Sequence, residues 1–290
     1  MTQEERRAAG GLWVPPGHFY SPLPDREELA TRGAEIFEAR PRQFAGIETN
    51  DEEQHHLIHE FRSYYGEEDL PEEQTPGRRY YANNEYFAYS DAFFLYCFLR
   101  RFRPARIVEV GSGFSSALML DVDADILGGQ IEYHFIDPYP ERLLGLLTTE
   151  DQERVRVDTR PVQEVELEVF EALGPRDFLF IDSSHVSKTG SDLNDLLFRV
   201  LPALSVGVLV HFHDVPYPFE YPRQWVLEGR AWNEAYVVRA FLQYNRAFQL
   251  RFYPSYLVAK NKDLARQWMP KCVDPHVSSS LWLERVSEAL

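Results

Sequence analysis

The chain has 290 residues, of which 44% are hydrophobic and 26% charged, a composition typical of a globular protein and not of a mainly disordered one. A formal net charge of −16 opposes binding to phosphate backbones, and no apolar run reaches the roughly 20 residues that span a bilayer, so we expect neither a nucleic-acid partner nor a membrane partner. The first residues lack the apolar segment of a signal peptide, which predicts a cytoplasmic protein.

Residues 1–88 are expected to form a mainly helical N-terminal extension. A stretch rich in proline and aromatic residues, 11–24, cannot be a regular helix. Helices are expected at 25–40, 50–65 and 91–102. The first would have Asp25 as its N-cap, and the third is apolar around most of its circumference, as buried helices are. We expect the extension to act as a lid, as a substrate contact or as a contact between copies in a homo-oligomer.

After residue 103, short apolar runs alternate with amphipathic helical stretches. The expected strands are 106–110, 131–136, 155–158, 177–181 and 206–212. This alternation predicts a parallel sheet with helices on both faces. Two further β-rich runs, 248–252 and 256–260, are separated by only three residues. They must pair antiparallel, because a parallel crossover needs a dozen or more residues.

The predicted fold class is therefore α/β, with a Rossmann-like, doubly wound, mostly parallel sheet that ends in an antiparallel hairpin. We expect this domain to cover residues 89–262. The tail, 263–290, can be assigned to neither strand nor helix from its pattern.

The first strand leads into a glycine-containing turn, EVGSGFSS at 109–116. Glycines at such a turn let a ligand approach the backbone, and the helix that follows offers free N–H groups. A dinucleotide fingerprint has a third small residue, usually glycine, where this chain has Ser116. Glu109 would repel a pyrophosphate and would favour the cationic groups of S-adenosylmethionine. Asp137, after the second strand, can accept two bonds from a ribose diol, which both cofactor classes carry. A tight turn without a ligand is the simplest alternative.

These residues resemble the class I methyltransferases that use S-adenosylmethionine, and the resemblance extends over roughly residues 89–260. It is most specific in EVGSGFSS, in FIDPYP at 135–140 and in the block from DFLFIDSSH to HFHDV at 177–215. The last block resembles the branch with IDxxH after the fourth strand and HD after the fifth, which includes natural-product O-methyltransferases. The resemblance implies that Gly111, Gly113 and Ser115 hold the methionine end of the donor. The candidate residues for cofactor binding are Glu109, Gly111, Gly113, Ser115, Ser116, Asp137 and Asp182.

A second group of polar residues follows the fourth and fifth strands. The carboxyl ends of adjacent strands line one crevice, so Asp182 and His185 should meet His213 and Asp214 beside the donor. In one interpretation Asp182, His213 and Asp214 bind a divalent cation, Mg²⁺ or a transition metal, which lowers the pKa of a substrate hydroxyl. In a second, His185 or His213 is a general base without a metal. A mainly structural role is the third. The candidate catalytic residues are Asp182, His185 and His213.

The sequence thus predicts a methyltransferase that acts on a hydroxyl of a small-molecule acceptor, and an amine acceptor stays open. Three other classes also stay open. They are an NAD(P)-dependent oxidoreductase, a non-catalytic nucleoside-binding interaction module, and a metal-dependent hydrolase or hydroxylase built around Asp182, His185 and His213.

Overall fold

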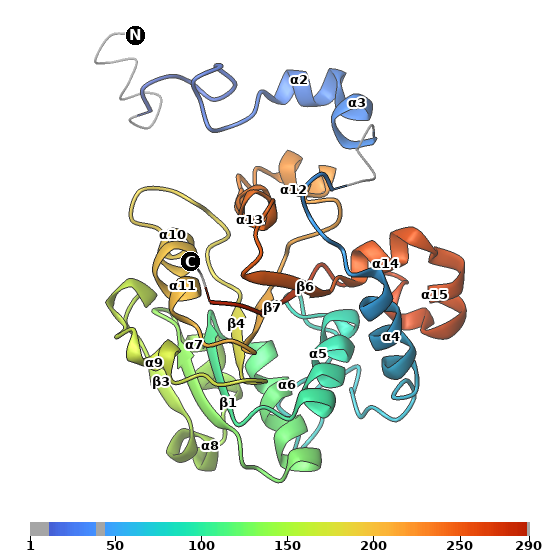
Figure 1. Cartoon of the computed structure of the whole chain (residues 1–290), viewed down its shortest axis with the longest axis vertical. Helices are drawn as coiled ribbons and strands as arrows, with labels where there is room; N and C mark the ends of the chain where they lie inside the picture. Colours follow the sequence, from blue (N-terminus) through green and yellow to red (C-terminus); the bar gives the residue numbers. More distant parts are fainter. Residues whose placement is uncertain (1–11, 39–43, 289–290) are drawn as a thin grey trace.

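The computed structural model describes residues 12–38 and 44–288. They contain a seven-stranded sheet with the order β3-β2-β1-β4-β5-β7-β6 (Figure 1). The strands are β1 (Arg106–Val110), β2 (Glu132–Ile136), β3 (Arg156–Asp158), β4 (Phe178–Ile181), β5 (Leu209–Phe212), β6 (Phe248–Phe252) and β7 (Leu281–Arg285). The first five strands in chain order are parallel, and β7 pairs antiparallel with both β5 and β6. The predicted fold class is confirmed: a Rossmann-like, mostly parallel sheet that ends in an antiparallel pair.

The helices occur before, between and after the strands. Those before the sheet are α2 (Arg26–Thr31), α3 (Gly33–Glu38), α4 (Asp51–Arg62) and α5 (Tyr89–Phe102). Those between strands are α6 (Phe114–Val122), α7 (Glu141–Leu146), α8 (Thr149–Arg154), α9 (Glu168–Glu171), α10 (Asp192–Asp195), α11 (Leu201–Ala203), α12 (Arg223–Glu228), α13 (Glu234–Leu242), α14 (Pro254–Lys260) and α15 (Lys262–Trp268). Short π or 3-10 turns occupy Asp123–Leu127, Val162–Glu164, Leu196–Val200 and Pro270–Cys272. Over the described ranges, no helix combines the length and apolar character that a bilayer crossing requires.

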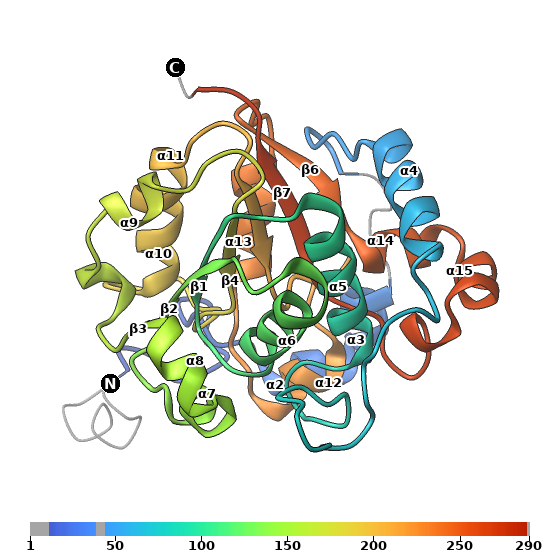
Figure 2. The same cartoon turned by 90° about the horizontal axis from the view of Figure 1, so that it is seen from below.

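Helices cover both faces of the sheet (Figure 2). Successive side chains of a strand point to opposite faces, so Ile107 joins the core beneath α5 and α6, whereas Val108 joins the core beneath α10 and α13. The central strand β4, with the sequence FLFI, is buried on both sides and apolar along its whole length. The helix α5 is buried around nearly its entire circumference, as predicted.

The second strand of the predicted hairpin lies elsewhere in the chain. Residues 256–260, expected to be a strand, belong to helix α14, and the strand that pairs with β6 is β7 from the tail. Pro254 stands in the first turn of α14, where its fixed φ and its missing N–H are tolerated. β7 takes the place between β5 and β6, and there Trp282 stacks on Phe98 of α5 with ring centroids 3.9 Å apart. The prediction of a strand at 256–260 is therefore wrong.

The first predicted helix is divided. Asp25 is its N-cap as expected, because Asp25 Oδ1 accepts bonds from two backbone N–H groups of the first turn at 2.8 and 3.2 Å. The helix is then interrupted at Arg32, between α2 and α3. The last two residues of the predicted range 25–40 lie outside the described residues.

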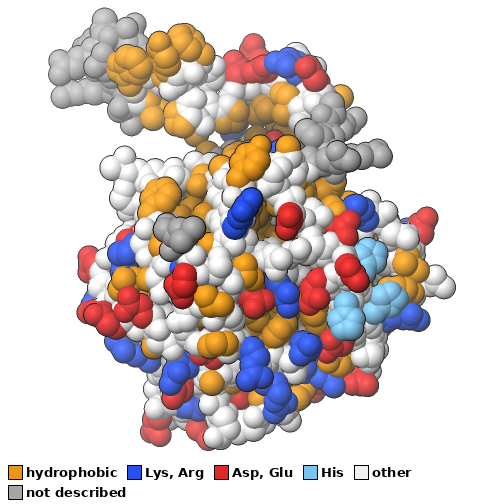
Figure 3. Space-filling model, viewed as in Figure 1, with side chains coloured by type: hydrophobic (Ala, Val, Ile, Leu, Met, Phe, Trp, Pro, Cys, Tyr) orange, Lys and Arg blue, Asp and Glu red, His pale blue; other side chains and the backbone are white. Residues whose placement is uncertain are grey.

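The N-terminal segment carries exposed aromatic side chains. Trp13, Phe19 and Tyr20 are all more than half exposed. The Trp13 ring stacks on Tyr20, and the Phe19 ring is tilted against Tyr20. Figure 3 shows hydrophobic side chains in orange at the top of the molecule, where the N-terminal segment lies. A side chain at Gly33 would meet the Arg223 guanidinium at 3.2 Å, so α3 packs against α12. A role of this segment as a lid or as an oligomer contact stays a prediction.

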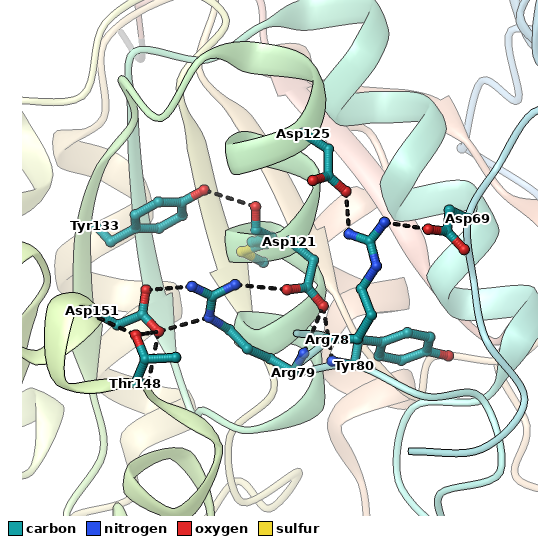
Figure 4. Close-up of polar contacts among 10 residues, drawn as sticks. Asp69, Arg78, Arg79, Tyr80, Asp121, Asp125, Tyr133, Thr148 and Asp151 are labelled. Atoms are coloured by element: carbon teal, nitrogen blue, oxygen red, sulfur yellow. Dashed lines mark hydrogen bonds and ion pairs between the residues drawn. The ribbon is translucent and has the colours of Figure 1, made fainter. Parts of the chain in front are cut away.

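Arg79 ties the segment before α5 to the sheet domain (Figure 4). Its guanidinium binds both carboxylate oxygens of Asp151, with N···O distances of 2.6 and 2.7 Å, and one oxygen of Asp121 at 2.7 Å. The second oxygen of Asp121 accepts the backbone N–H groups of Arg79 and Tyr80 at 3.0 and 2.9 Å. The loop that leads into α5 is thus fixed to α6 and α8.

Candidate active site

Four parallel strands end in register at one edge of the sheet. Backbone N–H groups just beyond each strand donate to carbonyl oxygens at the end of a neighbouring strand. These bonds run from Asp137 to Asp158, from Gly111 to Ile136, from Asp182 to Val110 and from His213 to Ile181, at 2.9 to 3.0 Å. The strand order reverses between β1 and β4, which is where open α/β sheets bind ligands. The residues predicted after β1, β2, β4 and β5 therefore share this edge.

Gly111 lies where the ends of β1 and β4 meet. Its φ of +83° is in the left-handed region, and a Cβ there would lie 1.8 Å from the carbonyl oxygen of Asp182. Only glycine fits such a contact between two backbones. Gly111 is thus required by the packing of the site itself, and a role of this residue in holding a ligand stays a prediction.

Glu109 is fully buried and faces the first turn of α6. Its carboxylate accepts a bond from Ser115 Oγ at 2.5 Å and another from Ser116 Oγ, which itself accepts the N–H of Gly113 at 3.0 Å. Burial raises the pKa of Glu109 to about 8, although both serine bonds favour the charged form. Glu109 thus links β1 to α6, and its contact with a methyl donor, like those of the two serines, stays a prediction.

We expect Glu109→Gln to make the protein less sensitive to alkaline pH. The folded-state pKa of Glu109 is raised, so its contribution to stability is complete below about pH 4.5 and is lost as the pH rises toward 8. The variant cannot lose a proton there. Its free energy of unfolding relative to the wild type should therefore increase by about 4 kcal/mol between pH 5 and pH 8.5, measured by chemical denaturation.

The control for this measurement is Glu132→Gln. Glu132 is an exposed residue at the start of β2, paired with Arg106 at 2.8 Å, and its replacement should not reproduce the gain seen for Glu109→Gln. Parallel stability profiles for wild type and Glu109→Gln would mean that Glu109 is already ionised in the folded protein.

Asp137 is held beside the glycine loop by backbone and hydroxyl groups. Its Oδ2 accepts from Ser112 N at 2.9 Å and from Ser112 Oγ at 2.8 Å, and its Oδ1 accepts from Tyr139 N at 2.8 Å. Oδ2 already accepts two bonds, whereas Oδ1 keeps a lone pair for a further donor. Because Asp137 is partly exposed, a ribose diol can reach it in this orientation.

Both ring nitrogens of His185 face carboxylates. Nδ1 lies 2.7 Å from Glu234 Oε2, and Nε2 lies 3.3 Å from Asp182 Oδ1. Burial alone would lower the pKa of His185, but the two carboxylates raise it well above its ordinary value. Its backbone has a φ of +58°, and its carbonyl accepts the N–H groups of Asn233 and Glu234. His185 is therefore a fixed imidazolium without a nitrogen free to take a proton.

His213 is buried beside the carboxylate of Asp214. Its Nε2 lies 3.8 Å from Asp214 Oδ1, whereas Nδ1 has no hydrogen-bond partner among the described residues. Burial alone would lower the pKa of His213, but the carboxylates of Asp214, Asp182 and Asp91 raise it to about 9. Asp91 is partly buried, and its buried Oδ1 atom also lacks a partner within the described ranges. Asp214 has a φ of +54° and accepts the Ser279 hydroxyl at 2.9 Å.

Asp182, His213 and Asp214 are not arranged as ligands of one metal ion. In the part of the chain that the structure describes, no three His, Cys, Asp or Glu side chains are placed to hold one ion. Asp182 is directed to His185 and Asp214 to Ser279, so these oxygens already have protein partners. A divalent cation at Asp182, His213 and Asp214 stays a prediction.

Three side chains beside this site were not predicted: Asp91 on α5, Glu234 on α13 and Arg142 on α7. Each lies in the first turn of its helix. An acidic residue there is explained by the helix dipole alone, so Asp91 and Glu234 give no separate signal. A cation in the first turn is unfavourable, and this is the signal that could have identified Arg142.

Two comparisons relate the chain to known proteins. Residues 108–215, which run from within β1 to just beyond β5 of the Rossmann-like sheet, match the family model of a methyltransferase domain. The chain is 40% identical over 170 residues to an uncharacterized protein of Archaeoglobus fulgidus, a match that covers 56% of this chain and 75% of that protein. The chain belongs to the same family as this archaeal protein.

Solved methyltransferase structures are more distant. The O-methyltransferase TomG of Streptomyces achromogenes, involved in tomaymycin synthesis and solved in complex with SAM, is 13% identical, with 90% of this chain and 96% of that chain covered and a TM-score of 0.43. The SAH-bound methyltransferase PaMTH1 of Podospora anserina is 14% identical, with 92% and 99% covered and a TM-score of 0.42. No residue of the site is assigned from these likenesses.

Proposed function

We propose that the protein is an S-adenosylmethionine-dependent methyltransferase that acts on a hydroxyl group of a small molecule. The observation that carries the proposal is the meeting, within a methyltransferase domain, of three features at one sheet edge. These are the glycine loop after β1, the oriented carboxylate of Asp137 and the buried group of Asp182, His185 and His213.

The donor would lie across the ends of β1 and β2. Oδ1 of Asp137 would accept a hydroxyl of the ribose diol, and the loop from Gly111 to Ser115 would face the methionine end. Bound there, S-adenosylmethionine supplies a methyl group activated by the sulfonium charge. The net charge of −16 and the carboxylates at this edge favour such a cationic ligand over a pyrophosphate.

The acceptor would lie over the ends of β4 and β5. The side chain of Asp182 is 31% exposed, so it can hold the acceptor hydroxyl, and the ion pair with His185 keeps its carboxylate in place. His213 would take the hydroxyl proton while the new oxygen–carbon bond forms and the carbon–sulfur bond breaks. His185 cannot take that proton, because both of its nitrogens are bound to carboxylates.

An NAD(P)-dependent oxidoreductase accounts less well for the sheet. The dinucleotide fold orders its strands 3-2-1-4-5-6, whereas here the antiparallel strand β7 stands between β5 and β6. Ser116 also occupies the place of the third glycine of that fingerprint, and its hydroxyl binds Glu109.

Calorimetry with S-adenosylhomocysteine and with NAD⁺ tests the proposal. We expect the wild type to bind the first ligand and not the second. Asp137→Asn should weaken the binding of S-adenosylhomocysteine by at least about tenfold, because a hydrogen bond to a charged group contributes roughly 1.5–3 kcal/mol. The matched control is Asp125→Asn, at an exposed residue after α6, which should leave the affinity unchanged. Binding of NAD⁺ alone would contradict the proposal.

A further inference from the structure

Arg142 reaches from the first turn of α7 across the glycine loop. A Cβ at Gly113 would lie 2.9 Å from Arg142 Cδ, so the stem of the arginine lies against the loop backbone. The φ of Gly113 is 165°, outside the left-handed region, so this angle does not call for glycine. The absence of a side chain at position 113 instead leaves room for Arg142.

The guanidinium rests on a fixed aromatic ring. Its central carbon lies 3.6 Å from the centroid of the Tyr86 ring, and that ring stacks on Phe114 at 6.2 Å and 12°. The backbone of Tyr86 is held in turn by Asn84, whose Oδ1 accepts the N–H groups of Tyr86 and Phe87 at 3.0 and 2.6 Å. The Arg142 guanidinium therefore has an aromatic partner on one side before any ligand binds.

The charge of Arg142 is not paired by the protein. Within the described residues its guanidinium forms no ion pair with a carboxylate, whereas those of Arg79 and Arg160 each bind two. It also stands at the N-terminal end of a helix, where a cation is unfavourable. Partial burial would raise the pKa of Asp182, but His213, His185 and Arg142 lower it, so the guanidinium lies within electrostatic reach of the crevice.

We infer that Arg142 binds the carboxylate of the donor's amino-acid moiety and so selects a ligand that carries one. The inference rests on the proposed function and names the residue that binds the carboxylate of the donor. A guanidinium offers a planar fork that forms two parallel hydrogen bonds with a carboxylate. Because the arginine contacts both Gly113 and Tyr86, it lies beside the loop that the methionine end would face.

The test compares two ligands that differ only in this carboxylate: S-adenosylmethionine and its decarboxylated form, S-adenosylmethioninamine. By calorimetry we expect the wild type to prefer S-adenosylmethionine by about 10- to 100-fold, the range for a charge-assisted bond pair. Arg142→Met should reduce this preference to about threefold or less and leave the affinity for S-adenosylmethioninamine unchanged. Arg142→Lys, which keeps the charge without the fork, should give an intermediate preference.

Variants of Tyr86 and of the distant Arg106 distinguish a loss of carboxylate binding from a loss of folding. Tyr86→Phe keeps the ring and should keep the preference, whereas Tyr86→Leu should reduce it. Arg106→Met, at the opposite end of β1, should change neither affinity. The inference is overturned if the wild type binds both ligands equally, if Arg142→Met keeps the full preference, or if Arg142→Met weakens both ligands alike. A wild type that binds neither ligand overturns the proposed function, and the inference with it.

Discussion

Replacement of His213 by asparagine is expected to lower the rate of methyl transfer by about 10²- to 10⁴-fold, the usual contribution of a general base. In the group of side chains after β4 and β5, His213 keeps an unpartnered ring nitrogen, whereas both nitrogens of His185 are bound to carboxylates. The rate is measured as S-adenosylhomocysteine release with an acceptor selected from a panel of small phenols, catechols and alcohols. The affinity for S-adenosylhomocysteine should stay within about twofold, because Asp137 and the glycine loop are untouched.

The pH dependence of the same rate gives a second readout. Because the carboxylates around it raise the pKa of His213 to about 9, most of the base is protonated at neutral pH. The wild-type rate should therefore rise about tenfold per pH unit below pH 9 and level off above it. In His213→Asn this rise should disappear. A variant that keeps the wild-type slope would place the titrating base elsewhere.

His211 provides a matched control on the same strand. It lies on the same face as His213, with ring centroids 5.9 Å apart, and stacks on Phe180 at 3.8 Å. Both of its nitrogens lack hydrogen-bond partners among the described residues, and burial lowers its pKa well below the ordinary value. His211→Phe should therefore keep the rate and the pH profile. A loss of rate equal to that of His213→Asn would mean that both substitutions act through packing.

The edge of the sheet that carries the site could be predicted from the chain alone. Each strand is a run of apolar residues, and Asp137, Asp182 and His213 directly follow such runs. Parallel strands place their carboxyl ends together, so the order of the strands determines which residues gather there. This prediction requires only the order of the strands and no knowledge of side-chain contacts.

The partners of those side chains could not be predicted in the same way. Glu234 lies 49 residues after His185, and nothing in the sequence indicates which face of α13 presents it. The direction of Glu109 depends on how tightly the first turn of α6 packs, because Ser115 and Ser116 bind its carboxylate only in that arrangement. The prediction that Glu109 attracts a cationic ligand assumes an exposed carboxylate, whereas in the structure this side chain is buried.

The strand β7, which pairs with both β5 and β6, shows the limit of local patterns. The run 256–260 and β7 both contain apolar and aromatic residues, and proximity to β6 favoured the first. The outcome depends on long-range packing, because Trp282 of β7 fills the space between Phe98 and Phe178. Local propensity is a weak guide where such a contact decides the pairing.

The largest expected loss of stability follows from Arg79→Met. The side chains of Asp121 and Asp151 are 7% and 3% exposed, and without Arg79 both would be buried without a counter-charge. Breaking a buried ion pair from one side costs about 3 kcal/mol or more. We expect a loss of about this size in the free energy of unfolding at pH 7, measured by chemical denaturation. Backbone and hydroxyl bonds to both carboxylates remain and limit the loss.

The pH dependence and the neighbouring arginine distinguish this loss from a general effect of substitution. Burial would raise the pKa of Asp151, but its bonds from Arg79 and Thr148 lower it, so the stability it contributes is present above about pH 4 and is lost in acid. The difference between the wild type and Arg79→Met should therefore shrink as the pH falls below 4. Arg78 pairs with carboxylates that are 70% and 45% exposed, and Arg78→Met should cost less than about 1 kcal/mol. Equal losses for the two arginines would mean that the buried network adds nothing beyond surface charge pairing.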